Sequence, residues 1–158
     1  MLKDCMRLGL IGDVHAEDEL LQIAIDALTR EHAVDRILCT GDLVDGLGDV
    51  DRAVALLVAA NALIVRGNHD RWIRSDDMRS LPNAHRMTEL QSETIALLKT
   101  LPATLTLDVP HPVHKDKPGK LLLCHGVHAN DMCRLNPDDF GYAISSNDDH
   151  VPVARPAR

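Results

Sequence analysis

Apolar and polar positions repeat with two different periods along the first half of the chain. Short apolar runs of strand length alternate with longer segments in which apolar residues recur every three or four positions. The strand-like runs are 6–11, 34–39 and 62–65, and the helical segments are 17–31 and 49–60. This β-α-β-α-β order predicts parallel strands joined by right-handed crossovers.

The second half of the chain is less regular. Residues 68–85 are mostly polar and contain turn signals, so we expect a long, substrate-facing loop there. Residues 92–100 predict a third helix, capped by Ser92. Segments 104–109 and 120–124 flank a polar turn and predict an antiparallel hairpin.

The pattern weakens after residue 125. Residues 130–135 could form a short helix, and residues 137–140 could begin another. The end of the chain has no periodicity and carries prolines, which indicates a frayed tail. We therefore expect one α/β domain over residues 1–145 and an irregular tail over residues 146–158.

The composition favours a single globular domain and ranks a nucleic-acid role below the other functions. The chain has 158 residues, of which 45% are hydrophobic and 26% are charged. Aromatic residues make up only 2% and the net charge is -7, which argues against a surface that stacks bases or holds a phosphate backbone. No apolar run approaches the roughly 20 residues of a membrane span. The four cysteines form no CxxC pair, and we expect a reducing, cytoplasmic setting without membrane contact.

Polar side chains follow four of the predicted strands, each at the strand's carboxyl end. They are Asp13, His15, Asp42, Asp45, Asn68, His69 and His125. Ligands of open α/β sheets bind outside the carboxyl ends of the strands. Oxygen ligands and imidazoles hold the divalent ions that activate water for attack on phosphorus. We interpret Asp42 as the centre of this set, a carboxylate that bridges two metal ions.

The spacing of the other residues suggests their roles. Asp13 and His15 lie two apart on one loop and can hold one ion. Asn68 offers an amide oxygen to the second ion, together with His125. Two divalent ions about 3.5–4 Å apart can share a carboxylate and a hydroxide, and the hydroxide is then the nucleophile.

An acid for the leaving group is also present. His69 is adjacent to Asn68 and therefore points elsewhere, which leaves it free to protonate the leaving oxygen. Asp45 could orient and charge that imidazole. The two residues would then act as the catalytic pair of the site.

Each motif taken alone has a simpler explanation. A Gly-Asp pair after a strand is usually a turn, so Asp13 by itself would be structural. The Asn-His-Asp run at 68–70 could be only a helix N-terminus. We interpret five further polar residues as solvated surface: His32, His85, His111, His114 and Arg74. The conjunction of four motifs at successive strand ends nevertheless favours a metal site.

The ordered motifs resemble those of the calcineurin-like metallophosphoesterase superfamily. They are Gly12-Asp13-Val14-His15, Gly41-Asp42-Leu43-Val44-Asp45-Gly46, Gly67-Asn68-His69-Asp70 and Cys124-His125-Gly126. The resemblance covers residues 6 to about 126. It implies two packed mixed β-sheets flanked by helices and a dinuclear centre of manganese, iron, zinc or similar ions.

The resemblance also implies roles for the residues that match. Asp13 and His15 would bind the first ion, and Asn68 and His125 the second. Asp42 would bridge the two ions.

The resemblance implies that His69 would be the general acid, with Asp45 as its partner. Gly46 stands where protein serine/threonine phosphatases of this superfamily carry arginine, which points to the small phosphodiesterase branch.

One motif of the superfamily is missing. No Gly-His-x-His string, which would supply one histidine to each ion, follows His125. His128 and His150 are the nearest substitutes, and neither has the flanking glycine. The final strands of the second sheet are also missing or irregular. We expect that the chain is truncated or out of frame beyond about residue 150.

Two functions remain open at this point. The leading one is hydrolysis of a phosphodiester or phosphomonoester, with a small phosphorylated molecule or nucleotide as substrate. The alternative is a binding or scaffold module that keeps the fold without catalysis. Arg71, Trp72 and Arg74 could contact a phosphate or a base, although an exposed loop explains them equally well.

Overall fold

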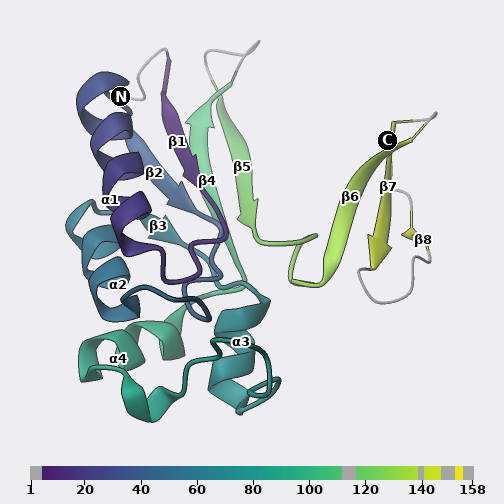
Figure 1. Ribbon diagram of the computed structural model, residues 1–158. Coiled ribbons are helices and arrows are strands. Elements are labelled where there is room, and N and C mark those ends of the chain that lie inside the picture. The colour runs from purple at the N-terminus through teal and green to yellow at the C-terminus, as the bar shows by residue number, and fades with distance from the viewer. Residues whose placement is uncertain (1–4, 112–116, 139–140, 147–151, 155–158) are drawn as a thin grey trace.

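A parallel sheet of three strands forms the middle layer of the protein (Figure 1). The structure, a computed structural model, describes residues 5–111, 117–138, 141–146 and 152–154. The strands are β1 (Leu8–Ile11), β2 (Arg36–Cys39) and β3 (Leu63–Ile64), paired in the order β1-β2-β3. The parallel arrangement predicted from the sequence is confirmed.

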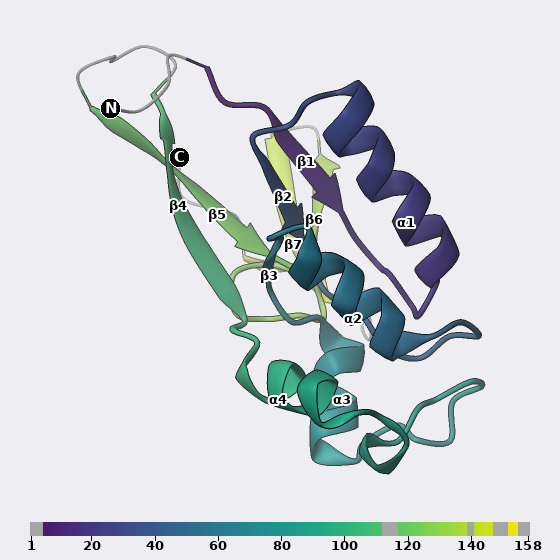
Figure 2. The same ribbon diagram turned by 90° about the vertical axis from the view of Figure 1, so that its left-hand side faces the viewer.

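Helices cover one face of this sheet (Figure 2). They are α1 (Asp18–Asp26), continued by the π-helical turn η1 (Ala27–Glu31), and α2 (Val50–Ala59). Their buried residues join those of the strands in one apolar cluster, which contains Leu21, Ile25, Ile37, Val54 and Leu57. This packing fixes the sheet, and the loops at its carboxyl edge start from a rigid base.

A hairpin of β4 (Thr104–Pro110) and β5 (Pro118–Cys124) covers the opposite face (Figure 2). Leu123 of the hairpin packs on Leu38 and Val65 of the parallel sheet in a second apolar cluster. The α/β fold with two packed sheets and flanking helices is therefore confirmed. The parallel and antiparallel strands are kept in separate sheets.

The predicted loop over residues 68–85 is wrong in its first part, because α3 (Asn68–Ser75) occupies it. The helix is mostly polar, so its apolar period is weak, and it starts at a cap in which Asp70 binds the backbone N–H of Gly67. A 3-10 turn, η2 (Met87–Glu89), follows.

The third predicted helix is present as α4 (Ser92–Thr100), but its predicted cap is wrong. Gln91 is the N-cap residue and makes no side-chain capping bond. The Ser92 hydroxyl donates to Glu93 instead. This helix is held by its apolar face, through Leu98, which is fully buried in the helix-covered core.

The described residues from 133 to 138 form a strand, so the helices expected over 130–135 and 137–140 are wrong; residues 139–140 lie outside the described residues. β6 (Cys133–Asp138), β7 (Gly141–Ser146) and the short β8 (Pro152–Ala154) make an antiparallel sheet to one side of the sandwich (Figure 1). Apolar and polar residues alternate from position 133 to 136, which is the strand period. The second layer of the sandwich therefore contains two strands, β4 and β5. β8 lies within residues 146–158, which were expected to form an irregular tail.

Two further expectations concern the chain as a whole. The four cysteines are free, and none is paired in a disulfide. Within the described ranges, no helix is long and apolar enough to cross a membrane.

Candidate metal centre

The loops that follow β1 and β2 carry the central residues of the site in an unusual backbone conformation. Asp13, His15, Asp42 and Asp45 have φ values of 51°, 44°, 52° and 68°. These left-handed values are uncommon for residues other than glycine, although aspartate and histidine adopt them more readily than most. The loops therefore hold their side chains in a conformation that is unfavourable locally and is maintained by the surrounding fold.

Two glycines allow the Asp42 loop to approach the start of α3. Gly41 has a φ of 97°, and a Cβ atom there would lie 2.3 Å from the backbone N of Gly67. A Cβ atom on Gly67 would lie 2.0 Å from Oδ1 of Asp42. With glycine at both positions, Oδ1 of Asp42 accepts a hydrogen bond of 2.9 Å from the backbone N–H of His69.

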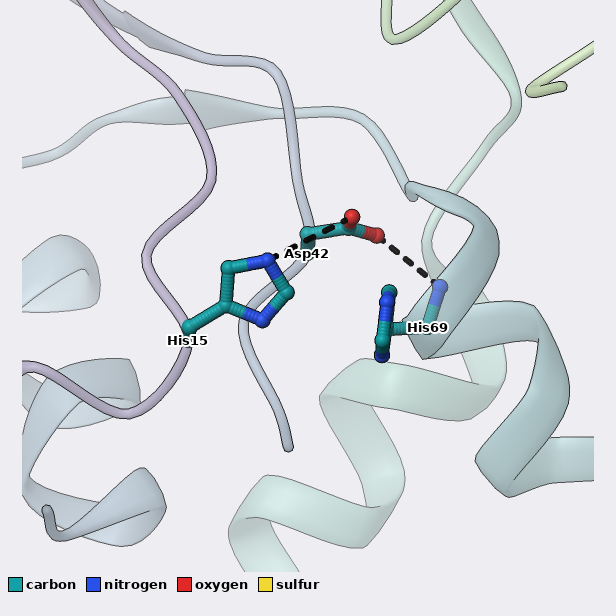
Figure 3. Close-up of side chains that lie close together, drawn as sticks. All are labelled: His15, Asp42 and His69. Carbon is teal, nitrogen blue, oxygen red and sulfur yellow. Dashed lines mark hydrogen bonds and ion pairs between the residues drawn. The ribbon is translucent and has the colours of Figure 1, made fainter. Parts of the chain in front are cut away.

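Asp42 lies at the centre of two groups of potential metal ligands. One group is His15, Asp42 and His69, and the other is Asp13, Asp42 and His125; the ligand atoms in each group lie within 4.8 Å of one another. The carboxylate of Asp42 is 3% exposed and faces both His15 and the first turn of α3 (Figure 3). The predicted convergence of strand-end residues on Asp42 is thus seen in the geometry.

The Nδ1 hydrogen bonds of two histidines orient their Nε2 atoms toward Asp42. Nδ1 of His15 lies 3.0 Å from the carbonyl oxygen of Asp45, and Nδ1 of His125 lies 2.9 Å from that of Thr40. A carbonyl oxygen only accepts, so both Nδ1 atoms carry the proton. Metal-binding histidines commonly donate their other N–H in this way.

The Nε2 atoms of both histidines face oxygen atoms of the site. Nε2 of His15 is 3.9 Å from Oδ2 of Asp42, and Nε2 of His125 is 3.5 Å from the same oxygen. His125 Nε2 also lies 3.0 Å from Oδ1 of Asn68. Two imidazole nitrogens, a carboxylate oxygen and an amide oxygen thus converge on one place. The donor set therefore fits divalent metal ions that accept oxygen and imidazole ligands.

Asp70 connects α3 to the Asp42 loop and was not given a role from the sequence. Its carboxylate is fully buried and accepts hydrogen bonds from the backbone N–H groups of Gly67, Asp42 and Leu43, at 2.8 to 2.9 Å. Burial raises the pKa of Asp70 to about 6, although these hydrogen bonds oppose the rise. The signal in the sequence was an aspartate at the third position of a helix, a typical capping position.

Asp45 and His69 form the predicted pair. Nδ1 of His69 donates to Oδ2 of Asp45 at 2.8 Å. Burial alone would raise the pKa of Asp45, but hydrogen bonds from His69 and Arg79 hold it well below its usual range. Burial alone would lower the pKa of the His69 ring, but the hydrogen bond to Asp45 and the charge of Asp42 raise it.

Two residues of the 76–86 loop complete this pair and were missed. Arg79 donates to both oxygens of Asp45, at 2.8 and 2.9 Å, and its side chain is only 5% exposed. The backbone N–H of His85 donates to Oδ1 of Asp45 at 2.9 Å, and its ring accepts from Asp45 N–H at 3.1 Å. The prediction that His85 is solvated surface is therefore wrong. Nothing in the local sequence pattern distinguishes these two residues.

Burial raises the pKa of Asp42. The charge of His125 and the hydrogen bond from the His69 N–H oppose this rise without cancelling it. A carboxylate that is costly to ionise when unpaired gains most from a cation beside it. The electrostatics of Asp42 therefore agree with its place between the two ligand groups.

The substrate contacts suggested for the 71–74 segment are partly corrected. Arg71 is bound to Asp131, with two hydrogen bonds of 2.8 and 2.9 Å. The Trp72 ring packs on the His69 ring, with 4.6 Å between centroids. Arg74 is exposed on α3, as the surface interpretation predicted.

The substitute histidines are not brought to Asp42 by the described part of the chain. His128 is exposed at a turn, with a φ of 55°, and belongs to neither ligand group. His150 lies outside the described residues, as does His114.

An open pocket of about 350 Å³ lies over the ligand groups. Five of the predicted site residues line it, together with residues of the loop after β5 and the first two residues of β6. The lining residues are Asp13, Thr40, Asp42, Asn68, His69, His125, Gly126, Asp131, Cys133 and Arg134.

Comparisons with known proteins agree with this geometry. A family model described as calcineurin-like phosphoesterase matches residues 6–151. A solved structure described as the crystal structure of a "putative diadenosine tetraphosphatase" is similar, with a TM-score of 0.57 and 20% sequence identity, over 96% of this chain and 70% of that one. At this identity the likeness shows the fold alone. No curated protein matches the chain.

Proposed function

The chain belongs to the calcineurin-like phosphoesterase family, and we propose that it is a metal-dependent hydrolase of phosphodiester or phosphomonoester bonds. The observation that carries this proposal is the position of Asp42 in both ligand groups, with the Nε2 atoms of His15 and His125 facing it. A carboxylate in that position can serve two ions at once. Substrates would meet it in the pocket above.

The metal-binding assignment follows the predicted residues. Asp13 and His15 would hold one ion, Asn68 and His125 would hold the other, and Asp42 would be shared. Two such ions lower the pKa of a water molecule and neutralise the charge that develops on the phosphoryl oxygens. The mixed oxygen and imidazole set suits manganese, iron or zinc.

The proton for the leaving group would come from His69. Its Nδ1 proton is held by Asp45, so the Nε2 proton is the one available to the leaving oxygen. Arg79 keeps Asp45 ionised and in place through its two hydrogen bonds. The edge contact between His15 and His69, with 4.7 Å between ring centroids, further restricts the His69 ring.

The absence of a Gly-His-x-His string from the sequence affects affinity. Loss of outer-sphere partners alone costs about 10–100-fold in metal affinity, so two fewer direct ligands should cost more. We therefore expect activity to require added metal ions at high concentration.

The substrate that we propose is a nucleotide or a similar small phosphorylated molecule, in keeping with the small phosphodiesterase branch. The diadenosine tetraphosphatase described for the similar structure supports that class. The alternative of a non-catalytic scaffold is less well supported, because a scaffold has no use for a half-buried acid held by Asp45, which Arg79 holds in turn.

Hydrolysis of bis-p-nitrophenyl phosphate with and without Mn²⁺ tests the proposal. We expect activity only with Mn²⁺, and we expect Asp42→Asn to lower kcat/KM by at least about 100-fold, because it removes the shared ligand. Asp108→Asn, an exposed residue of β4, is the matched control and should keep full activity. An Asp42→Asn variant as active as the control would contradict the proposal, and inactivity of all three proteins would favour the scaffold alternative.

A further inference from the structure

The segment after β5 folds into a compact loop at the pocket. We call residues 126–134, which comprise this loop and the first two residues of β6, the wall loop. A Cβ atom on Gly126 would lie 2.3 Å from the carbonyl oxygen of Asn130 and 2.8 Å from that of Cys133, so the loop folds back closely on Gly126. Val127 and Asn130 exchange two backbone hydrogen bonds of 2.9 and 3.1 Å. The wall loop is therefore a defined structure that only glycine at position 126 permits.

An ion pair fixes the wall loop to α3. Nε and Nη2 of Arg71 donate to the two oxygens of Asp131, at 2.8 and 2.9 Å, and the Asp131 side chain is 11% exposed. A bidentate pair of this kind fixes direction as well as distance. Because α3 also carries Asn68 and His69, the ion pair holds the wall loop in register with the predicted catalytic residues.

The wall loop supplies the positive charge of the pocket. Asp131, Cys133 and Arg134 line it, and the charge of Asp131 is already balanced by Arg71. Arg134 is the one lysine or arginine among the described lining residues, and its side chain is exposed. None of the described residues forms an ion pair with it. A guanidinium presents a planar fork that matches a phosphate group.

The pocket has room for more than the phosphate that reacts. Its volume of about 350 Å³ falls within the range of roughly 300–1,000 Å³ that is typical of small-ligand pockets. The reacting phosphate would lie at the ligand groups around Asp42, which come from the strand ends. Arg134 lines the same pocket and belongs to neither ligand group, so it would contact the substrate beside the metal ligands.

We propose that Arg134, held in place by the wall loop, selects substrates that carry at least one further phosphate besides the one that is cleaved. This inference rests on the proposed phosphoesterase function and names the substrate class more narrowly. The selected molecules are nucleoside polyphosphates and dinucleoside polyphosphates.

The test compares two substrates that differ in the number of phosphates. Wild-type protein and the variants Arg134→Ala and Arg134→Lys are assayed with Mn²⁺ on diadenosine tetraphosphate and on diadenosine monophosphate. We expect Arg134→Ala to reduce the preference for the tetraphosphate, as a ratio of kcat/KM values, by about 10–100-fold, which is the usual contribution of a hydrogen bond to a charged group. Arg134→Lys should retain part of the preference, because it keeps the charge but not the fork.

Arg30→Ala is the matched control, since Arg30 is an exposed arginine of η1 that does not line the pocket. It should leave the preference as in the wild type. A wild-type protein without preference, or an Arg134→Ala variant with the wild-type ratio, would overturn the inference.

A binding measurement separates this inference from the proposed function. Trp72 is the only tryptophan of the chain and packs on His69, so its fluorescence reports on the pocket without turnover. If the wild type cleaves neither substrate, the proposed function fails. The inference then still requires Arg134→Ala to bind diadenosine tetraphosphate about 10-fold or more weakly than the wild type; equal binding by the two proteins would overturn it.

Discussion

The aspartates of the site differ in what their surroundings do to them. Asp45 is buried among donors from His69, Arg79 and His85, which hold its pKa well below the usual range, so it is charged at neutral pH. Asp42 is buried with fewer donors, and burial raises its pKa. Protons and metal ions therefore compete for Asp42, and metal affinity should fall as the pH is lowered. Similar residues thus have different roles because of their neighbours.

The Asp45–His69 pair predicts a pH effect. Asp45 raises the pKa of His69, so the ring stays protonated to higher pH and can act as an acid there. Asp45→Asn removes the negative charge and leaves Arg79 unpaired beside the ring, so the pKa of His69 falls. The decline of kcat/KM with rising pH should therefore begin at lower pH in the variant.

This effect is best measured on a diester with an alkyl leaving group, because such a group needs the acid more than p-nitrophenol does. General acid catalysis typically contributes about 10²–10⁴-fold, and Asp45→Asn should lose part of that factor. Asp108→Asn again serves as the control. Coincident pH profiles for Asp45→Asn and the control would show that Asp45 does not act through His69.

Sequence reasoning at the residue scale succeeded where the chemistry follows directly from a motif. Asp13, His15, Asp42, Asn68 and His125 were predicted because each follows a strand, and the structure brings them to one edge of the sheet. Their assignment as ligands stays a prediction.

Arg79 and His85 could not be found in this way. Their contacts with Asp45 span 34 and 40 residues of the chain. Such pairings depend on how the 76–86 loop folds back over the site, which local periodicity does not describe.

Among the secondary-structure elements, α3 has the strongest influence on the site. Its first turn supplies Asn68, His69 and Asp70, and its N-terminus binds Asp42 directly. The positive end of the helix dipole also points at this carboxylate. The close approach depends on the small size of Gly67, where no side chain fits.

A substitution at Gly67 tests this dependence. Gly67→Ala would place a Cβ atom 2.0 Å from Oδ1 of Asp42, so Asp42 or the helix must shift. We expect a loss of about 1–3 kcal/mol in the free energy of unfolding, as for other overpacked positions. Metal-dependent activity should fall as well. Urea denaturation measures the first effect.

Gly119→Ala, in β5, is the matched control, because its Cβ atom would lie 3.3 Å from the side chain of Val109, a tight contact that a shift of a few tenths of an ångström relieves. That variant should stay within about 0.5 kcal/mol of the wild type, as most tolerated surface changes do. Equal stability of the two variants would contradict the importance that we give to the Gly67 contact.

Elements with a clear apolar period were predicted, and those without one were not. The strands of the parallel sheet and the helices α1, α2 and α4 bury one continuous apolar face. The helix α3 buries little besides Ile73 and depends on capping by Asp70, so its polar sequence was read as a loop. In β6 apolar and polar residues alternate over only four positions, and the sequence there was interpreted as parts of two helices.

At the scale of the whole molecule, the sandwich places the site at one edge. Helices cover one face of the parallel sheet and the hairpin covers the other, so the carboxyl ends of the strands remain open to ligands (Figure 2). The net charge of -7 includes the acidic ligands, which bound cations would offset. The family match confirms this architecture, while a domain boundary at residue 145 stays a prediction.

The most direct test of the central claim, that Asp42 is shared by two metal ions, is the number of Mn²⁺ ions bound per chain. Equilibrium dialysis at saturating Mn²⁺, followed by elemental analysis, gives this number for the wild type, Asp42→Asn and the control Asp108→Asn. We predict two ions per chain for the wild type and the control, and fewer than two for Asp42→Asn. One ion or none in the wild type, or two ions in Asp42→Asn, would contradict the account.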